Sequence, residues 1–154
     1  MQRIFDTLAF DFVCQISPQQ QHGSIIVDPP HLRYTKQGAK PLNEFGNKSF
    51  CRFRIPDELH QAGVYILTVD GVPYYVGECI HLSKRYNIGY GQISPRNCYV
   101  GGQVTNCRIN HLICQSVLEG KRIDLWFYET ADRFDVESYL IRTLGTQKHW
   151  NRKK

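Results

Sequence analysis

Apolar and polar positions near the middle of the chain predict a β-hairpin. Residues 64–69 and 72–76 form two short apolar runs rich in β-branched and aromatic side chains, which are typical of strands. Asp70 and Gly71 stand between them, and this dipeptide tolerates positive φ angles and closes tight hairpins. We therefore expect two neighbouring antiparallel strands at the centre of the fold.

The pattern after the hairpin predicts helices around one more strand. Residues 81–86 are typical of a helix that ends near residue 89, and residues 105–118 repeat apolar side chains at helical spacing after a capping pair, Thr105 and Asn106. Residues 123–128 predict a third strand.

Asp132 is positioned to cap a last helix. We expect its inward face to carry the apolar residues Phe134, Val136, Leu140, Ile141 and Leu144. Residues 63–154 thus predict an α+β core, a three-stranded antiparallel sheet flanked by helices.

Residues 1–62 predict a β-rich extension packed on this core. Short extended pieces are expected over residues 4–13, 24–27 and 49–55, separated by turn-rich segments. In the last piece, buried-type residues alternate with Arg52 and Arg54, the period of a half-buried strand. Its outer face is either an ordinary solvated surface or a surface that contacts phosphates.

Composition and charge narrow the class of protein. The chain has 154 residues and 42% hydrophobic residues, enough for one folded domain, and no apolar run approaches the roughly 20 residues that span a bilayer. The N-terminus lacks the layout of a signal peptide, so we expect a cytoplasmic protein without a membrane partner. The net charge of +5 suits a phosphate-rich partner, although many unrelated proteins share it. The cations concentrated in residues 148–154 point the same way, unless they form a solvated tail.

Six cysteines raise the question of metal binding. The tightest constellation is Cys107, His111 and Cys114, which share one face at helical spacing, but a structural zinc site normally needs four ligands. In a reducing cytoplasm, free thiols are the expected state.

Five elements in order along residues 63–151 resemble the GIY-YIG nuclease family. Gly63-Val64-Tyr65 and Tyr75-Val76-Gly77 match its two name-giving motifs, with valine in place of isoleucine. Arg85 follows where the family carries an arginine on its first helix. Glu137 matches its metal-binding glutamate, and Trp150-Asn151 its asparagine after an aromatic residue.

This resemblance implies a DNA endonuclease that depends on Mg²⁺ (or Mn²⁺). Glu137 is then the metal ligand, Arg85 holds a non-bridging phosphate oxygen, Tyr65 is a candidate general base and Tyr75 orients the nucleophile. A free phenol has a pKa of about 10, so such a base needs a nearby cation, for which Arg85 and Lys84 are candidates.

One position of the family pattern is occupied differently here. Members usually carry a histidine or tyrosine one helical turn after the arginine, and Gly89 stands there in this chain. We take Tyr90 as the substitute and expect Tyr86 to point elsewhere.

The DNA itself is expected to contact a wider basic surface. Lys84, Arg96, Arg108, Asn151 and Arg152 are the candidate contacts, and Arg96 lies in the Gly-rich loop of residues 89–104. That loop is either a lid that touches DNA or a packed connection.

Several roles remain open at this point. With no helix-turn-helix or zinc finger after the core, a restriction or defence enzyme is favoured. A repair or single-strand-specific nuclease and a non-catalytic nucleic-acid-binding module are the alternatives. A homodimer would suit symmetric cleavage of a duplex.

Overall fold

The computed structural model describes residues 1–33 and 40–152. Its main feature is a five-stranded sheet with the strand order β1-β2-β7-β5-β6, in which every neighbouring pair is antiparallel. In chain order the strands are β1 (Gln2–Phe5), β2 (Leu8–Gln15), β5 (Gly63–Val69), β6 (Val72–Cys79) and β7 (Ile123–Glu129). The expected α+β class is confirmed.

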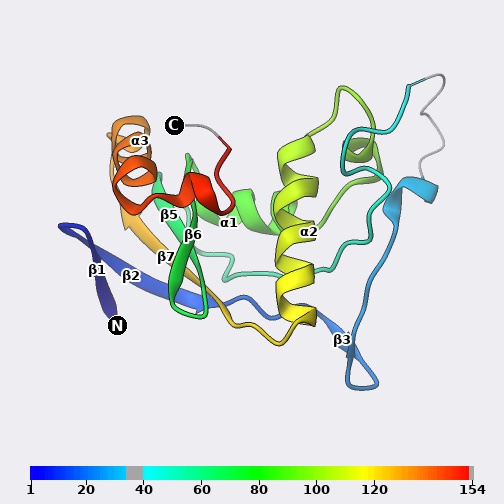
Figure 1. Cartoon of the computed structure of the whole chain (residues 1–154), viewed down its shortest axis with the longest axis horizontal. Coiled ribbons are helices and arrows are strands. Elements are labelled where there is room, and N and C mark those ends of the chain that lie inside the picture. Colours follow the sequence, from blue (N-terminus) through cyan, green and yellow to red (C-terminus); the bar gives the residue numbers. More distant parts are fainter. Residues whose placement is uncertain (34–39, 153–154) are drawn as a thin grey trace.

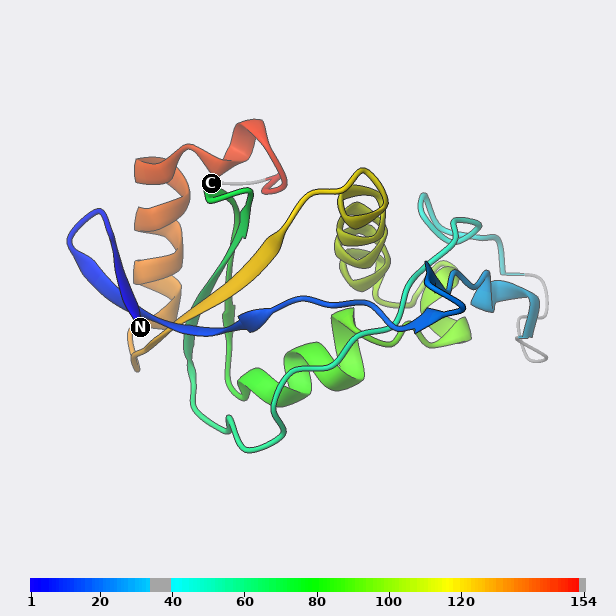
Figure 2. The same cartoon turned by 90° about the horizontal axis from the view of Figure 1, so that it is seen from below.

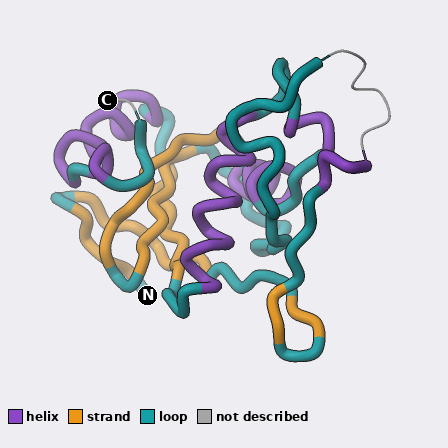
Figure 3. The backbone as a smooth tube through the Cα atoms, turned by 45° about the vertical axis from the view of Figure 1, so that its right-hand side comes forward, coloured by secondary structure: helices purple, strands orange, loops and turns teal. Residues whose placement is uncertain are grey.

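The prediction of three strands is wrong, because the N-terminal hairpin extends the sheet. Strand β2 pairs with β7 along the edge that β5 leaves open, from Asp11 opposite Phe127 to Gln15 opposite Asp124. Strand β1 then pairs with β2. The extension therefore packs on the core by continuing its sheet, and in Figure 3 these strands gather on one side of the molecule.

The central hairpin has the turn that the sequence predicts. Asp70 and Gly71 have φ angles of 49° and 83°, the two positive values of a type I′ turn, and Val69 pairs with Val72 across it. Strand β5 lies between β6 and β7 and is buried along its whole length. This explains its continuous apolar run, since both faces of the strand meet other residues.

Helices cover the two faces of the sheet (Figures 1 and 2). Helix α3 (Arg133–Leu144) packs on the face that carries Val64 and Ile66. The other face carries Tyr65 and Leu67, and it meets α2 (Val104–Leu118) and a helix that starts as α1 (Leu82–Lys84) and continues as the π-helical segment η2 (Arg85–Tyr90). Alternate residues of β5 thus feed two separate cores.

The remaining short elements lie in the connections. They are β3 (Gln20–Gln21), paired with β4 (Ser24–Ile25), and three 3₁₀ helices, η1 (Pro30–Arg33), η3 (Pro95–Cys98) and η4 (Thr146–Lys148). Residues 89–104 form a packed connection: Ile93, Cys98 and Tyr99 are buried with Phe50 and Cys107.

Residues 51–55 alternate as predicted but do not form a strand. Cys51 and Ile55 are buried, yet their backbone groups bond to side-chain amides rather than to another strand. The Asn110 side chain accepts from the Cys51 N–H (3.1 Å) and donates to the Cys51 carbonyl (2.9 Å). The Asn87 side chain likewise accepts from the Ile55 N–H (2.8 Å) and donates to the Ile55 carbonyl (2.9 Å). Two buried asparagines thus hold this segment against η2 and α2.

Helix boundaries differ in detail from the prediction. Helix α2 begins at Val104 with Gln103 at its cap, one residue before the predicted capping pair. In α3, Leu140 and Ile141 are buried as expected, but Phe134 is 58% exposed and packs under the Arg133 guanidinium in the first turn. Among the described residues, no helix is long and apolar enough to cross a bilayer.

Candidate active site

Both motif glycines are required by close packing. A Cβ atom on Gly77 would overlap the ring and hydroxyl of Tyr65, which lies across from it in the register of β5 and β6. A Cβ atom on Gly63 would overlap the carbonyl of Tyr128 on β7. The second motif therefore needs glycine so that the tyrosine of the first motif can lie flat on the sheet.

The two motif tyrosines lie on the same face of the hairpin. Tyr65 pairs with Gly77, and Tyr75 pairs with Leu67, so the two phenols are diagonal neighbours with ring centroids 6.2 Å apart. Their hydroxyls meet through a third phenol. The Tyr90 hydroxyl lies 2.7 Å from that of Tyr65 and 3.4 Å from that of Tyr75.

The π-helical turn explains how Tyr90 reaches this position. A π helix bonds residue i to residue i+5, and the Gly91 N–H donates to the carbonyl of Tyr86 at 2.6 Å in this way. The wider turn holds one extra residue, so Tyr90 lies one turn after Arg85 although Gly89 occupies the i+4 position. Such π turns occur frequently at functional sites.

The sequence led us to expect that Tyr86 points away from the site, and this prediction is wrong. Its ring packs edge-on against Tyr65 (5.2 Å between centroids) and against Tyr90 (5.1 Å). Its buried hydroxyl has no hydrogen-bond partner among the described residues. Tyr86 thus supports the phenol cluster by packing.

Burial keeps the two motif phenols in their neutral form. It raises the pKa of Tyr65 well above its ordinary value, and the neighbouring phenols add to the shift, whereas Arg85 opposes it only in part. Burial and Tyr90 likewise raise the pKa of Tyr75. Neither Tyr65 nor Tyr75 therefore has the cation-lowered pKa that a tyrosinate base requires.

A first hollow of about 320 Å³ opens beside Tyr75. Glu137 from α3 and Arg108 from α2 line it, together with Asn151 and Arg152 from the C-terminal segment. Glu137 is half-buried, and its charge acts on the Tyr75 phenol. Burial lowers the pKa of Arg108, which donates to the carbonyl of Trp150 at 2.6 Å. This hollow, the Glu137 hollow, brings together five predicted site residues, Tyr75 among them.

A second hollow of about 430 Å³ contains Arg85. Lys84 and His81 line it as well, and the first turns of α2 contribute to the walls of both hollows. Arg85 interacts electrostatically with Tyr65 and Tyr90, whereas the charge of Glu137 acts on Tyr75. Arg85 and Glu137 therefore share the cluster but do not line one hollow.

Asn151 has a structural partner that the sequence did not reveal. Its side chain accepts from the Val76 N–H (2.8 Å) and donates to the Val76 carbonyl (2.9 Å), so the amide completes the outer edge of β6 within the second motif. The Trp150 N–H donates to the Tyr74 carbonyl (3.0 Å) in the same way. The C-terminal segment is thereby fixed beside Tyr75.

The other expected DNA contacts are dispersed. Arg152 is exposed and paired with Glu44 (2.6 Å) at the rim of the Glu137 hollow. Arg96 is exposed on η3 and lines neither hollow. Lys153 and Lys154 of the basic tail lie outside the described residues.

Two polar groups near the site were missed from the sequence. Glu78, directly after the second motif, pairs with Arg133 at the start of α3 and interacts with Arg85. Asn110 donates to the Tyr90 carbonyl (2.7 Å) and so fixes the end of the π turn. The burial of Asn110 could have been inferred from its place on the apolar face of a predicted helix, one turn before Ile113.

Side chains on the cysteine-rich face of α2 pack against separate neighbours and do not converge on a common metal position. The Cys107 thiol donates to the Asn97 carbonyl (3.2 Å), and His111 Nδ1 lies 3.4 Å from the Ser49 carbonyl. Within residues 1–33 and 40–152, no three His, Cys, Asp or Glu side chains are close enough to hold a metal ion together.

Comparison of the chain with protein-family models, curated protein sequences and solved structures finds no match.

Proposed function

We propose that this protein is a Mg²⁺-dependent endonuclease of the GIY-YIG kind, which hydrolyses phosphodiester bonds in DNA. One observation carries the proposal. The Tyr90 hydroxyl contacts the tyrosine hydroxyls of both motifs, at 2.7 Å from Tyr65 and 3.4 Å from Tyr75. Three phenols that meet at their hydroxyls, with Arg85 and Glu137 lining separate hollows next to them, supply the groups that phosphodiester hydrolysis needs.

In this proposal, Tyr75 is the phenol that meets the substrate. It is 8% exposed and lines the Glu137 hollow, whereas Tyr65 and Tyr90 are each 1% exposed. Because their pKa values are raised, Tyr65 and Tyr75 act as neutral phenols, and Tyr75 orients the attacking water by a hydrogen bond. Tyr90 joins the two motif hydroxyls and so holds Tyr75 in position.

Glu137 suits Mg²⁺, which in nucleases is often bound by one or two carboxylates, with water and substrate phosphate completing its shell. It is the one carboxylate among the residues that line its hollow. When bound there, Mg²⁺ would supply charge stabilisation at the phosphoryl oxygens and the leaving oxygen.

The cations hold and orient the DNA. Arg108 and Arg152 line the Glu137 hollow, and Lys84 lies beside Arg85 in the other. Arginine forks can bind phosphate oxygens in pairs, which fixes the strand relative to the phenols. Six free thiols suit action in the reducing cytoplasm.

The test is incubation of supercoiled plasmid, duplex oligonucleotides and single strands with the purified protein in Mg²⁺ or in EDTA. We expect Mg²⁺-dependent nicks or breaks, and the three substrates distinguish a duplex enzyme from a single-strand-specific one. DNA that stays intact in Mg²⁺ and in Mn²⁺ would refute the proposal.

A non-catalytic nucleic-acid-binding module is the second candidate. The burial of Tyr65 and Tyr90 favours it, because phenols at 1% exposure also serve as sheet packing. Binding of DNA without cleavage under every metal condition would identify this function.

A further inference from the structure

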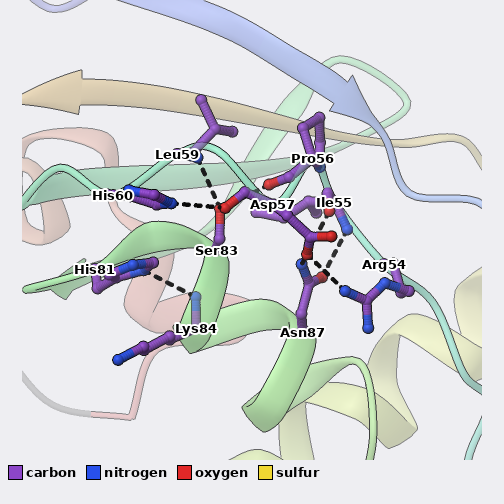
Figure 4. Close-up of polar contacts among 10 residues, drawn as sticks. All are labelled: Arg54, Ile55, Pro56, Asp57, Leu59, His60, His81, Ser83, Lys84 and Asn87. Atoms are coloured by element: carbon purple, nitrogen blue, oxygen red, sulfur yellow. Dashed lines mark hydrogen bonds and ion pairs between the residues drawn. The ribbon is translucent and has the colours of Figure 1, made fainter.

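A basic pocket lies beside the Arg85 hollow, on the outer side of α1 and η2. It is a hollow of about 240 Å³, and we define it by the cationic and imidazole side chains Arg54, His60, His81 and Lys84 (Figure 4). His81 and Lys84 also line the Arg85 hollow, so the two hollows share a wall. The basic pocket is therefore the direct neighbour of the hollow that Arg85 lines.

The walls of the basic pocket are held rigidly. The Ser83 hydroxyl donates to the Pro56 carbonyl (2.6 Å) and accepts from the Leu59 N–H (3.0 Å). Asn87 bonds both backbone groups of Ile55. The segment from Arg54 to His60 is therefore fixed against the helix, and little ordering is left for a ligand to impose.

The imidazoles have defined tautomers. His81 Nδ1 accepts from the Lys84 backbone N–H (3.2 Å), so a neutral His81 carries its proton on Nε2. The His60 Nε2–H donates to the Asp57 carbonyl (3.0 Å). The ring centroids of His60 and His81 lie 4.7 Å apart. His81 thus offers an N–H donor to an anion even when the ring is uncharged.

The charges in the pocket favour an anionic ligand. Arg54 and Lys84 are cations with exposed side chains, and Asp57 is the one carboxylate among the residues that line the pocket. Asp57 pairs with Arg54 and also accepts from Asn87 Nδ2 (2.9 Å). An ion pair this exposed contributes little free energy, so a phosphate can replace Asp57 as the partner of the Arg54 guanidinium.

We propose that the basic pocket binds a backbone phosphate of the nucleic acid next to the phosphate held by Arg85. This inference rests on the proposed function and deepens it, because it gives the strand a second contact on a defined side of the cut. Arg54 and His81 are then phosphate contacts, and His60 packs beside His81 as part of the wall.

The test measures binding of a labelled duplex in EDTA, where no cleavage occurs, over a series of salt concentrations. Arg54→Gln should weaken binding for all sequences and lower the salt slope by about 1, as expected for one lost phosphate contact. Asp57→Asn should act in the opposite direction and tighten binding, because it removes the anion and keeps an oxygen for Asn87. The matched control is Arg122→Gln, an exposed arginine paired with Asp124 beside the hairpin turn.

Methylphosphonate substitution locates the contact. In a series of duplexes that each carry one neutralised phosphate, one position should weaken binding to the parent protein. The same duplex should bind Arg54→Gln no more weakly than the unmodified duplex does. An unchanged slope for Arg54→Gln, or equal effects of Arg54→Gln and Arg122→Gln, would overturn the proposal. So would an Arg54-dependent site that binds a mononucleotide while duplex binding is unaffected.

The outcomes also separate this proposal from the proposed function. DNA that binds with the Arg54 dependence but stays intact in Mg²⁺ supports the pocket and refutes the nuclease. DNA that is cut while Arg54→Gln keeps the parental slope supports the nuclease and refutes the pocket.

Discussion

Removal of the Tyr65 hydroxyl gives a stability change that reverses with pH. At neutral pH, Tyr65→Phe loses the 2.7 Å contact with Tyr90 and should destabilise the protein by about 1 kcal/mol, the net value of a typical buried hydrogen bond.

The reversal follows from the raised pKa of the buried phenol. Its stabilising contribution is fully present below the unfolded pKa of about 10 and is lost as pH rises toward the folded value. The parent then loses about 1.4 kcal/mol per pH unit relative to the variant. The two proteins should be equally stable near roughly pH 11, and above that the variant should be the more stable.

Urea unfolding followed by tryptophan fluorescence at a series of pH values measures both proteins. Tyr86→Phe is the matched control: its pKa is also raised by burial, but its hydroxyl has no partner among the described residues. It should show the same slope without a loss at neutral pH. A stability difference between the parent and Tyr65→Phe that stays constant through this range would refute the buried, neutral phenol.

Three further substitutions test the site. Gly77→Ala should cost about 1–3 kcal/mol in urea unfolding, because its Cβ displaces the Tyr65 ring. Asn151→Ala should cost about 2–4 kcal/mol in the same assay, since it leaves both backbone groups of Val76 without their partner. Arg85→Ala should abolish cleavage and weaken DNA binding in a gel or anisotropy assay, because it removes an attractive phosphate contact.

Each of these has a control in the chain. Gly89→Ala should be tolerated, because the nearest atoms to its Cβ are 3.7 Å away. Asn47→Ala changes an exposed asparagine, and Arg122→Ala removes an exposed arginine that lines neither hollow. Effects on the controls equal to those on the test variants would contradict the assigned contacts.

The local structure of the hairpin could be predicted because it depends on near neighbours. Asp70 and Gly71 determine the turn, and the turn sets the register that places Tyr65 and Tyr75 on one face. The strand order could not be predicted in the same way. The choice of β2 for the open edge of β7 depends on contacts more than a hundred residues apart in sequence.

The candidate site shows the same division. Glu137 and Arg85 could be chosen as candidates from their spacing to the motifs. Their separation into two hollows could not, because the start of α2 contributes to the walls of both hollows and its position depends on tertiary packing. Tyr90 reaches its position because the π turn holds one extra residue after Arg85. The sequence gives no sign of this turn, since Gly89 stands where an α-helix would place the next side chain on the same face. The direction of the Tyr65 pKa shift depends on burial by two helices, which no single motif encodes.

The central claim is that Glu137 provides the metal-dependent step of DNA cleavage, and its most direct test is the single-turnover cleavage rate of Glu137→Gln on saturating DNA. Asp135→Asn, an exposed acid on the same helix, is the control. We expect Glu137→Gln to fold normally, to bind DNA at least as well as the parent, and to cleave at least about 100-fold more slowly, in line with the loss of an electrostatic contact to the transition state. Cleavage by Glu137→Gln at the rate of the parent and of Asp135→Asn would contradict the account.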